Sequence, residues 1–198
     1  SSTIEFKQKA NEKKRTLAFG EDGVCEACGY AEQKKSINWN DRHKELEELC
    51  NRFRRTDGRY DVVVPGSGGK DSVQAAHILK YKYNMNPILI TWPPALYTDI
   101  GRRNFDAWLD AGFANYTYNQ NKKLHRFLTK NAFLNLGHPF QPFILGQKNL
   151  APRLSVLLDI PLVVFGENEA EYGNSIEDNE EPTRDPKYYS AELSVQDL

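Results

Sequence analysis

The stretch 60–72 constrains the fold of this chain more than any other. It begins with three valines (62–64), a β-branched apolar run that is typical of a short buried strand. Three glycines then occur within 66–69, and a helical pattern of apolar residues follows. A strand, a glycine loop and a helix N-terminus together can bind an anion, because glycine lets the backbone approach a ligand closely and the first helical N–H groups point toward negative charge.

The rest of the chain alternates between strand and helix patterns. This alternation predicts an α/β fold, a Rossmann-like parallel sheet with helices on both faces. An amphipathic helix is expected at 39–56, before the sheet. The expected strands of the sheet are 61–65, 87–92, 115–118 and 161–165. The further expected helices are 70–83, 99–111, 121–135 and 143–158, and the last of these is expected to be kinked or split at Pro152.

Ligands of such sheets bind beyond the carboxyl ends of the strands. Three loops are therefore expected to share one site, namely 65–72, 91–99 and 166–174. The third loop carries several carboxylates, and Glu167 follows directly after the last expected strand. A carboxylate that faces a nucleoside triphosphate is favourable only when Mg²⁺ lies between the two, or when the carboxylate binds a hydroxyl or an amine of the ligand.

Length and composition are those of one soluble α/β domain. The chain has 198 residues, a net charge of −1 and 39% hydrophobic residues, so bulk charge does not indicate a nucleic-acid partner. No apolar run approaches the roughly 18 residues that span a bilayer, and no membrane partner is expected. The expected segments are an N-terminal segment (1–38), a linker helix (39–57), the main domain (58–175) and an acidic, partly flexible end (176–198). Because the chain starts without Met, it is expected to be a fragment.

The cysteines indicate a metal site and a reducing compartment. Cys25 and Cys28 have the spacing of half a zinc site, in which two thiolates on a tight turn occupy two of four tetrahedral corners. The other pair of ligands is expected upstream of residue 1, and the alternative is that both cysteines are unliganded. Cys50 falls on the apolar stripe of the 39–56 helix and is expected to pack in the core. Three cysteines, an odd number, favour a cytoplasmic location.

The glycine loop matches neither of the two common phosphate-binding patterns. G-x-x-x-x-G-K-[ST] fails because position 71 is Asp, and G-x-G-x-x-G fails because Gly68 is followed by Gly69, Lys70 and Asp71. What remains is Ser67-Gly-Gly-Lys-Asp-Ser72, in which two hydroxyls and a Gly-Gly turn surround one phosphate group. An aspartate within the loop is compatible with phosphate if it binds Mg²⁺ or caps backbone amides. This arrangement suits the pyrophosphate of ATP.

The motif Ser67–Ser72 after a valine strand resembles the signature of the PP-loop ATP pyrophosphatases, whose fold is adenine nucleotide alpha hydrolase-like. These enzymes cleave ATP between its α and β phosphates and adenylate a substrate oxygen. Most of the chain resembles one group of them, the N-acetyl sugar amidotransferases of lipopolysaccharide O-antigen and flagellin-sugar biosynthesis. The segments that carry this resemblance are Cys25–Cys28, Ile37–Arg42, Val64–Ser72, Thr91–Gly101, His138–Phe143, Gly146–Asn149 and Gly166–Asn174.

The resemblance implies a carbon–nitrogen ligase that turns the acetamido group of a nucleotide-linked sugar into an acetamidino group. It implies ATP and Mg²⁺ as cofactors, AMP and pyrophosphate as products, and ammonia from a separate glutaminase subunit. It also implies Zn²⁺ in an N-terminal zinc-knuckle-like appendage. The identity of the sugar and the formation of a homodimer are left open.

The expected site residues fall into three groups. Asp71, Lys70 and Glu167 are expected to take part in the reaction, and Asp71 also binds Mg²⁺. The sugar is expected to contact Gln147, Lys148, Asn149 and Glu171. The ATP-binding residues are expected to be Ser67, Gly68, Gly69, Lys70, Asp71, Ser72, Thr91, Trp92, Gly166, Glu167 and Asn168.

Two other functions remain as alternatives. Transfer-RNA thiolases combine a zinc knuckle with the same loop, but they need a basic surface and a catalytic cysteine. A non-catalytic ATP-binding assembly module would bind ATP without releasing pyrophosphate. Release of AMP with an acetamido sugar and ammonia distinguishes the amidotransferase from both.

Overall fold

The computed structural model describes residues 19–167 and Thr183. The chain divides into two compact units, one comprising Ser1–Asn40 and Asn168–Leu198 and the other Asp41–Glu167. Each unit is described by itself below. Among the described residues, no helix has the length and apolar character needed to cross a membrane.

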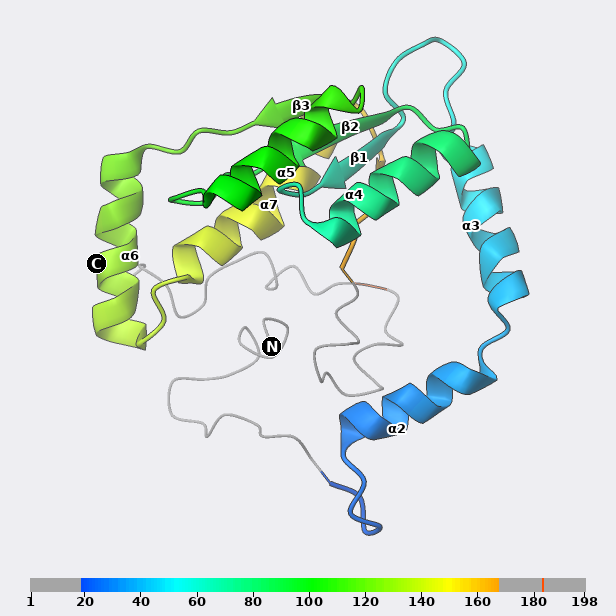
Figure 1. Ribbon diagram of the computed structural model, residues 1–198, viewed down its shortest axis with the longest axis horizontal. Helices are drawn as coiled ribbons and strands as arrows, with labels where there is room; N and C mark the ends of the chain where they lie inside the picture. The colour runs from blue at the N-terminus through cyan, green and yellow to red at the C-terminus, as the bar shows by residue number, and fades with distance from the viewer. Residues whose placement is uncertain (1–18, 168–182, 184–198) are drawn as a thin grey trace. The chain divides into compact units, whose positions relative to one another are not determined.

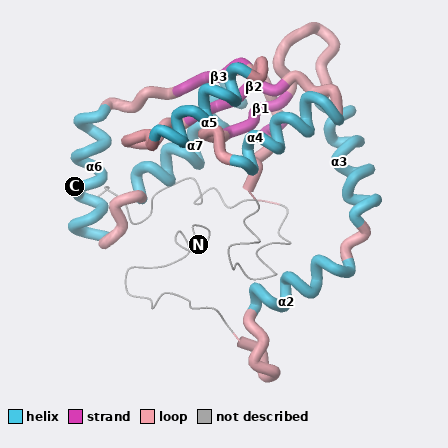
Figure 2. Tube along the Cα trace, in the orientation of Figure 1, coloured by secondary structure: helices cyan, strands magenta, loops and turns pink. Residues whose placement is uncertain are grey.

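Helices and strands alternate along the larger unit, as the sequence predicts (Figures 1 and 2). The smaller unit contributes α2 (Glu26–Gln33) and the short helix η1 (Lys34–Ser36). The remaining elements, in chain order, are α3 (Trp39–Phe53), β1 (Val62–Pro65), α4 (Lys70–His77), η2 (Ile78–Lys82), β2 (Pro87–Thr91), α5 (Asp99–Asp110), β3 (Ala114–Thr117), α6 (Lys122–Leu136), α7 (Gln141–Leu157) and β4 (Leu162–Val163).

The four strands form one sheet in the order β3-β2-β1-β4, and every neighbouring pair is parallel. Val62 of β1 lies opposite Pro87 of β2 on one side and Leu162 of β4 on the other. The chain runs from β1 outward through β2 to β3 and then returns to the other side of β1. The strand order therefore reverses between β1 and β4, which is the place where α/β sheets of this kind bind ligands. The α/β, Rossmann-like fold is confirmed.

Side chains that alternate along β1 supply the two cores. Val62 and Val64 pack with residues of α3, α4 and α5, whereas Val63 packs with residues of α7. Figure 1 shows α4 and α5 on one face of the sheet and α7 on the other. Because both faces are covered, β1 is apolar throughout and all three valines are fully buried.

Strand β4 and helix α7 are two of the elements that differ from the sequence-based expectations. Strand β4 contains only two residues, although the Val164 N–H still donates to the Val63 carbonyl at 2.9 Å. Helix α7 is not split, because it continues past Pro152 from Gln141 to Leu157. Residues Leu150, Ala151 and Leu154 around this proline are buried against the sheet, and their packing holds the helix together despite the missing N–H donor.

A buried carboxylate fixes the start of β1. Asp61 is almost inaccessible and accepts hydrogen bonds from the backbone N–H groups of Asn86 at 2.7 Å and Arg55 at 3.2 Å. It thereby joins the residue before β2 to the start of the loop that follows α3. The strand pattern alone did not identify this role, because the valines beside Asp61 dominate the sequence signal.

Candidate functional site

The glycine loop connects β1 to α4 at the reversal point of the sheet. The Gly66 N–H donates to the Ile90 carbonyl at 3.0 Å, so the loop stays joined to β2 beyond the end of β1. Gly68 has a φ of +87°, and a Cβ at this position would lie 2.8 Å from the Phe105 Cα. The loop therefore packs directly on the backbone of α5, and only glycine fits at position 68 without strain.

Helix α4 begins at Lys70, with Gly69 as its N-cap. Gly69 has no side chain that could cap the helix, and its carbonyl accepts hydrogen bonds from the Val73 N–H and the Ser72 hydroxyl, both at 3.1 Å. A Cβ added to Gly69 would meet nothing within 4 Å. There is therefore open space beside the first turn of the helix, where N–H groups and the helix dipole favour an anion.

A cation and a carboxylate lie side by side at this helix start. The Lys70 Nζ is 2.7 Å from the Asp71 Oδ1, and the two side chains are 89% and 49% exposed. The ammonium group of Lys70 can attract phosphate, and the carboxylate oxygens of Asp71 are ligands that Mg²⁺ prefers.

The loop after β4 meets the same helix start. Gly166 is so close to α4 that a Cβ on it would lie 2.5 Å from both the Asp71 carbonyl carbon and the Ser72 nitrogen. Two of the three predicted loops therefore come together, and Glu167, which is exposed, is the next residue. Asn168 and Glu171, which the sequence also assigned to the site, lie outside the described residues.

A chain of polar side chains connects strands β2 and β3 to the glycine loop. Thr91 is fully buried, and its hydroxyl donates to the Gly66 carbonyl at 2.7 Å. The Asn115 Nδ2 donates to the Thr91 Oγ1 at 2.9 Å, and the Thr117 hydroxyl donates to the Asn115 Oδ1 at 2.5 Å. The side chain of Thr91 therefore holds the glycine loop, and its expected contact with ATP stays a prediction. Asn115 was missed, because it lies opposite Leu89 in the β2–β3 register and no local pattern relates it to Thr91.

Thr91→Val should reduce stability by about 1–3 kcal/mol, because it removes the hydroxyl and leaves the amide of Asn115 and the carbonyl of Gly66 without this partner. Denaturant unfolding measures the effect. Thr117→Val is the matched control, because Thr117 is exposed and donates only to Asn115. Equal losses for the two variants would contradict a special role of Thr91.

Trp92 links the end of β2 to α7. Its ring stacks on Tyr118 with a centroid separation of 5.3 Å and an interplanar angle of 15°. Gly146 of α7 lies against the indole, since a Cβ on this glycine would be 2.2 Å from the Trp92 Cε2. The side chain of Trp92 is thus part of the packing between α7 and the end of β3.

The residues expected to contact the sugar lie on α7, after Gly146. Gln147 is exposed, whereas Lys148 and Asn149 are partly buried. The Asn149 Nδ2 donates to the Leu145 carbonyl of its own helix at 2.9 Å. The sugar-binding role of these three residues stays a prediction.

The cysteine pair begins a helix and not the expected tight turn. Cys25 is the N-cap of α2, and its Sγ accepts a hydrogen bond from the Cys28 N–H at 3.4 Å. Within residues 19–167 and 183, no three His, Cys, Asp or Glu side chains come together to hold a metal. The structure therefore does not support the zinc-knuckle appendage, because two thiols fill only half of a tetrahedral site. Cys50 is fully buried in the core, as predicted.

Alkylation should separate the three cysteines in the metal-free native protein. The hydrogen bond from the Cys28 N–H lowers the pKa of the Cys25 thiol, whereas burial raises the pKa of Cys50. Cys25 should react fastest with iodoacetamide near neutral pH and Cys50 only after unfolding, because the thiolate is the nucleophile. Peptide mass spectrometry measures the order, and early labelling of Cys50 would contradict its place in the core.

Comparison with known proteins adds a partial relative. No protein-family model matches the chain. The uncharacterized protein MJ1599 of Methanocaldococcus jannaschii is 31% identical over 77 residues, which are 39% of this chain and 27% of that protein. The match thus spans about a quarter of the relative's length. The relative is itself uncharacterized, so its name supplies no activity.

Proposed function

We propose that this chain is the ATP-cleaving part of an AMP-forming amidotransferase, which converts the acetamido group of a nucleotide-linked sugar into an acetamidino group. The observation that carries the proposal is the Ser67–Ser72 loop at the reversal point of the sheet, with Gly166 packed against its helix. The resemblance of the 91–101, 138–149 and 166–174 segments to N-acetyl sugar amidotransferases supports the choice of substrate.

The residues of the loop fit the phosphates of ATP. Gly68 and Gly166 pack tightly on protein backbone, but the space beside Gly69 is open and is next to the first N–H groups of α4. The hydroxyls of Ser67 and Ser72 and the ammonium group of Lys70 would contact the β and γ phosphates. Asp71 would hold Mg²⁺, which neutralises phosphate charge during the reaction.

The proposed reaction makes a poor electrophile reactive. The amide oxygen of the sugar attacks the α-phosphorus of ATP, the bond to the β-phosphate oxygen breaks, and pyrophosphate leaves. Ammonia then adds to the amide carbon, the carbon–oxygen bond breaks, AMP leaves with that oxygen, and an amidine remains. The protein would orient the groups and offset their charge, and Glu167 would orient the reacting amide.

Ammonia would come from a separate glutaminase subunit. Cys50 is buried in the core, and Cys25 and Cys28 lie together at the start of α2. The thiol of Cys50 is therefore closed to glutamine, and the Cys25 Sγ accepts a hydrogen bond from the Cys28 N–H. With two further ligands from elsewhere, Cys25 and Cys28 would hold Zn²⁺.

Mass spectrometry of the products tests the proposal. The full-length protein is incubated with nucleotide-linked acetamido sugars, ATP, Mg²⁺ and ammonium. The expected product has an imino group in place of the carbonyl oxygen, and AMP forms in equal amount. ATP binding without AMP release would favour the assembly module, and AMP release that depends on transfer RNA would favour the thiolase.

A further inference from the structure

Helix α6 belongs to a long stretch of the chain that contains no acidic residue. Between Asp110 and Asp159 there is no Asp or Glu. Helices α3 and α5 offset cations internally, through Arg42 and Glu45 (2.8 Å) and through Arg102 and Asp106 (2.8 Å). Helix α6 has no carboxylate with which to do so. The cations of the stretch are Lys122, Lys123, Arg126, Lys130, Lys148 and Arg153, and the first four lie on α6.

The outer face of α6 also carries large apolar side chains. Each is more than half exposed, whereas Ala132 on the opposite side is buried and α6 packs against α7. Leu124, Phe127 and Leu134 recur at helical spacing and so share one face of the helix. The exposed apolar residues of α6 are Leu124, Phe127, Phe133 and Leu134.

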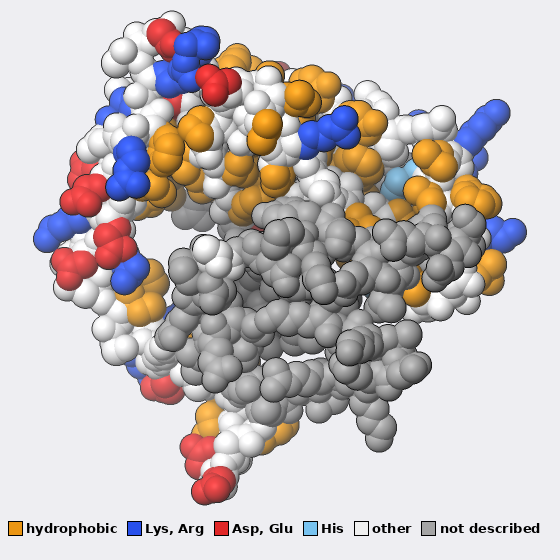
Figure 3. Space-filling view, turned by 180° about the vertical axis from the view of Figure 1, so that it is seen from behind, with side chains coloured by type: hydrophobic (Ala, Val, Ile, Leu, Met, Phe, Trp, Pro, Cys, Tyr) orange, Lys and Arg blue, Asp and Glu red, His pale blue; other side chains and the backbone are white. Residues whose placement is uncertain are grey.

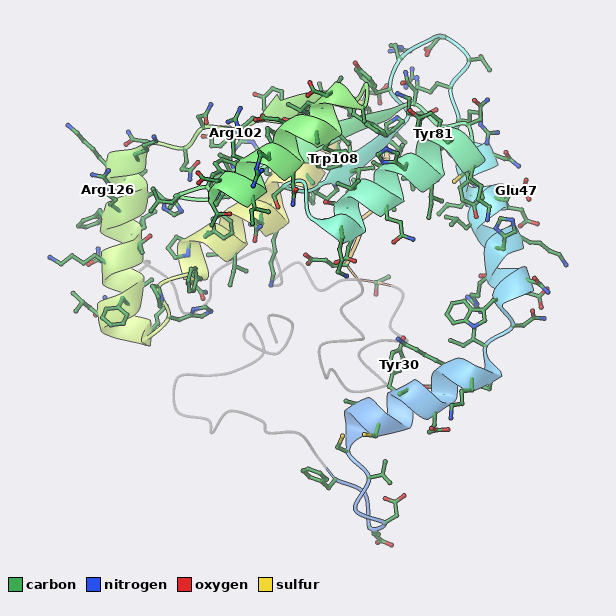
Figure 4. All side chains as sticks on the ribbon, viewed as in Figure 1. Tyr30, Glu47, Tyr81, Arg102, Trp108 and Arg126 are labelled. Carbon is green, nitrogen blue, oxygen red and sulfur yellow. The ribbon has the colours of Figure 1, made fainter. Side chains whose placement is uncertain are left out.

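Both ends of helix α6 are capped by residues of this chain. Asn121 caps its N-terminus by accepting hydrogen bonds from the N–H groups of Lys123 and Leu124, and Gly137 ends it with a φ of +64°. Figure 1 shows α6 at the margin of the larger unit, and Figure 3, which is seen from behind, shows orange and blue side chains together at the corresponding right-hand edge. Arg126 is labelled on this helix in Figure 4.

We propose that the outer face of α6, defined by Lys123, Leu124, Arg126, Phe127, Lys130 and Leu134, binds the surface of an anionic phospholipid bilayer. Leucine and phenylalanine side chains enter the boundary between headgroups and acyl chains, and lysine and arginine side chains contact the headgroup phosphates. The proposed binding is peripheral and needs no membrane-spanning helix. It is therefore compatible with a sequence that has no apolar run long enough to cross a bilayer.

The combination of charge and apolar area selects this partner. A second copy of the same face would bring like charges together, which opposes a dimer through α6. A nucleic acid would satisfy the cations but would leave the exposed leucines in water, because its backbone is charged. A bilayer surface that is anionic at the headgroups and apolar beneath them matches both kinds of side chain.

Vesicle sedimentation of the full chain tests the proposal. The protein should sediment with phosphatidylcholine vesicles containing phosphatidylserine and should remain in solution with phosphatidylcholine alone. Each cation near such a surface contributes a factor of roughly five, so Lys123→Glu with Lys130→Glu should weaken binding by about 25-fold or more. Phe127→Ala with Leu134→Ala should also weaken it, with unchanged circular dichroism.

The matched controls lie on other helices. Lys44→Glu reverses an exposed charge on α3, and Leu157→Ala removes an apolar side chain at the end of α7 that is also more than half exposed. Neither should change sedimentation. Equal binding to neutral vesicles, or undiminished binding of the α6 variants, would overturn the proposal. Binding of an RNA oligonucleotide that needs Lys123 and Lys130, without vesicle binding, would assign the face to nucleic acid instead.

Discussion

Asp71→Ala in the full-length enzyme is expected to reduce AMP formation by roughly 100-fold or more, which is the usual loss when one electrostatic group is removed from a reacting centre. Asp71 lies in the first turn of α4 and is half exposed, so its side chain is not part of the core. The loss should therefore appear mainly in the rate of AMP release, with only a small change in the melting temperature. Asp71→Asn, which preserves shape but removes the charge, should behave in the same way.

Asp41→Ala is the matched control for Asp71. Asp41 is also an exposed acid in the first turn of a helix, in this case α3, and it lies outside the three loops expected at the site. Each variant should lose only about 0.3–1 kcal/mol of stability through the helix dipole. Only the Asp71 variant should lose AMP formation. A normal rate for Asp71→Ala would remove this residue from the proposed site.

Gly68→Ala is expected to destabilise the protein by roughly 2–4 kcal/mol, because it adds backbone strain and steric overlap together. The φ of +87° is unfavourable for alanine, and the new Cβ would lie 2.8 Å from the Phe105 Cα. Since the clash is with helix backbone, a change of side-chain rotamer cannot relieve it. Either the loop or α5 must move. Thermal and denaturant unfolding measure the loss.

Gly69→Ala is the variant that distinguishes a loss of protein stability from a loss of ATP affinity. Gly69 has a φ of −70°, and a Cβ on it would meet nothing within 4 Å. Its alanine variant should fold with nearly unchanged stability. If the phosphates of ATP occupy the open space beside Gly69, ATP affinity should nevertheless fall. Equal stability of the two alanine variants would show that the contact of Gly68 with α5 does not constrain the loop.

The order of elements could be predicted because the local signals agree. The valine run, the glycine loop and the following amphipathic pattern all indicate strand, turn and helix, and the structure has β1 and α4 at these positions. Element ends were less predictable, because they depend on partners. Strand β4 is short although its sequence is apolar, and α7 continues through Pro152 because its neighbours are packed against the sheet.

The contacts that build the candidate site could not be read from spacing. Thr91 and Gly66 are 25 positions apart, and the hydroxyl of the first reaches the carbonyl of the second only because β1 and β2 pair in one register. Gly166 comes from the far end of the domain to the first turn of α4. No local pattern reports either contact, since both depend on how the strands are ordered.

The stretch 60–72 thus determined, by itself, that the chain has a strand, a glycine loop and a helix start suited to an anion. Those properties are local, because they follow from β-branched residues, from glycine and from the free N–H groups of a first helical turn. The tertiary structure decided the rest. It placed the loop where the strand order reverses, packed Gly68 on α5 and Gly166 on α4, and gave Thr91 a structural role, because strand pairing and helix packing act between residues that are distant in the chain.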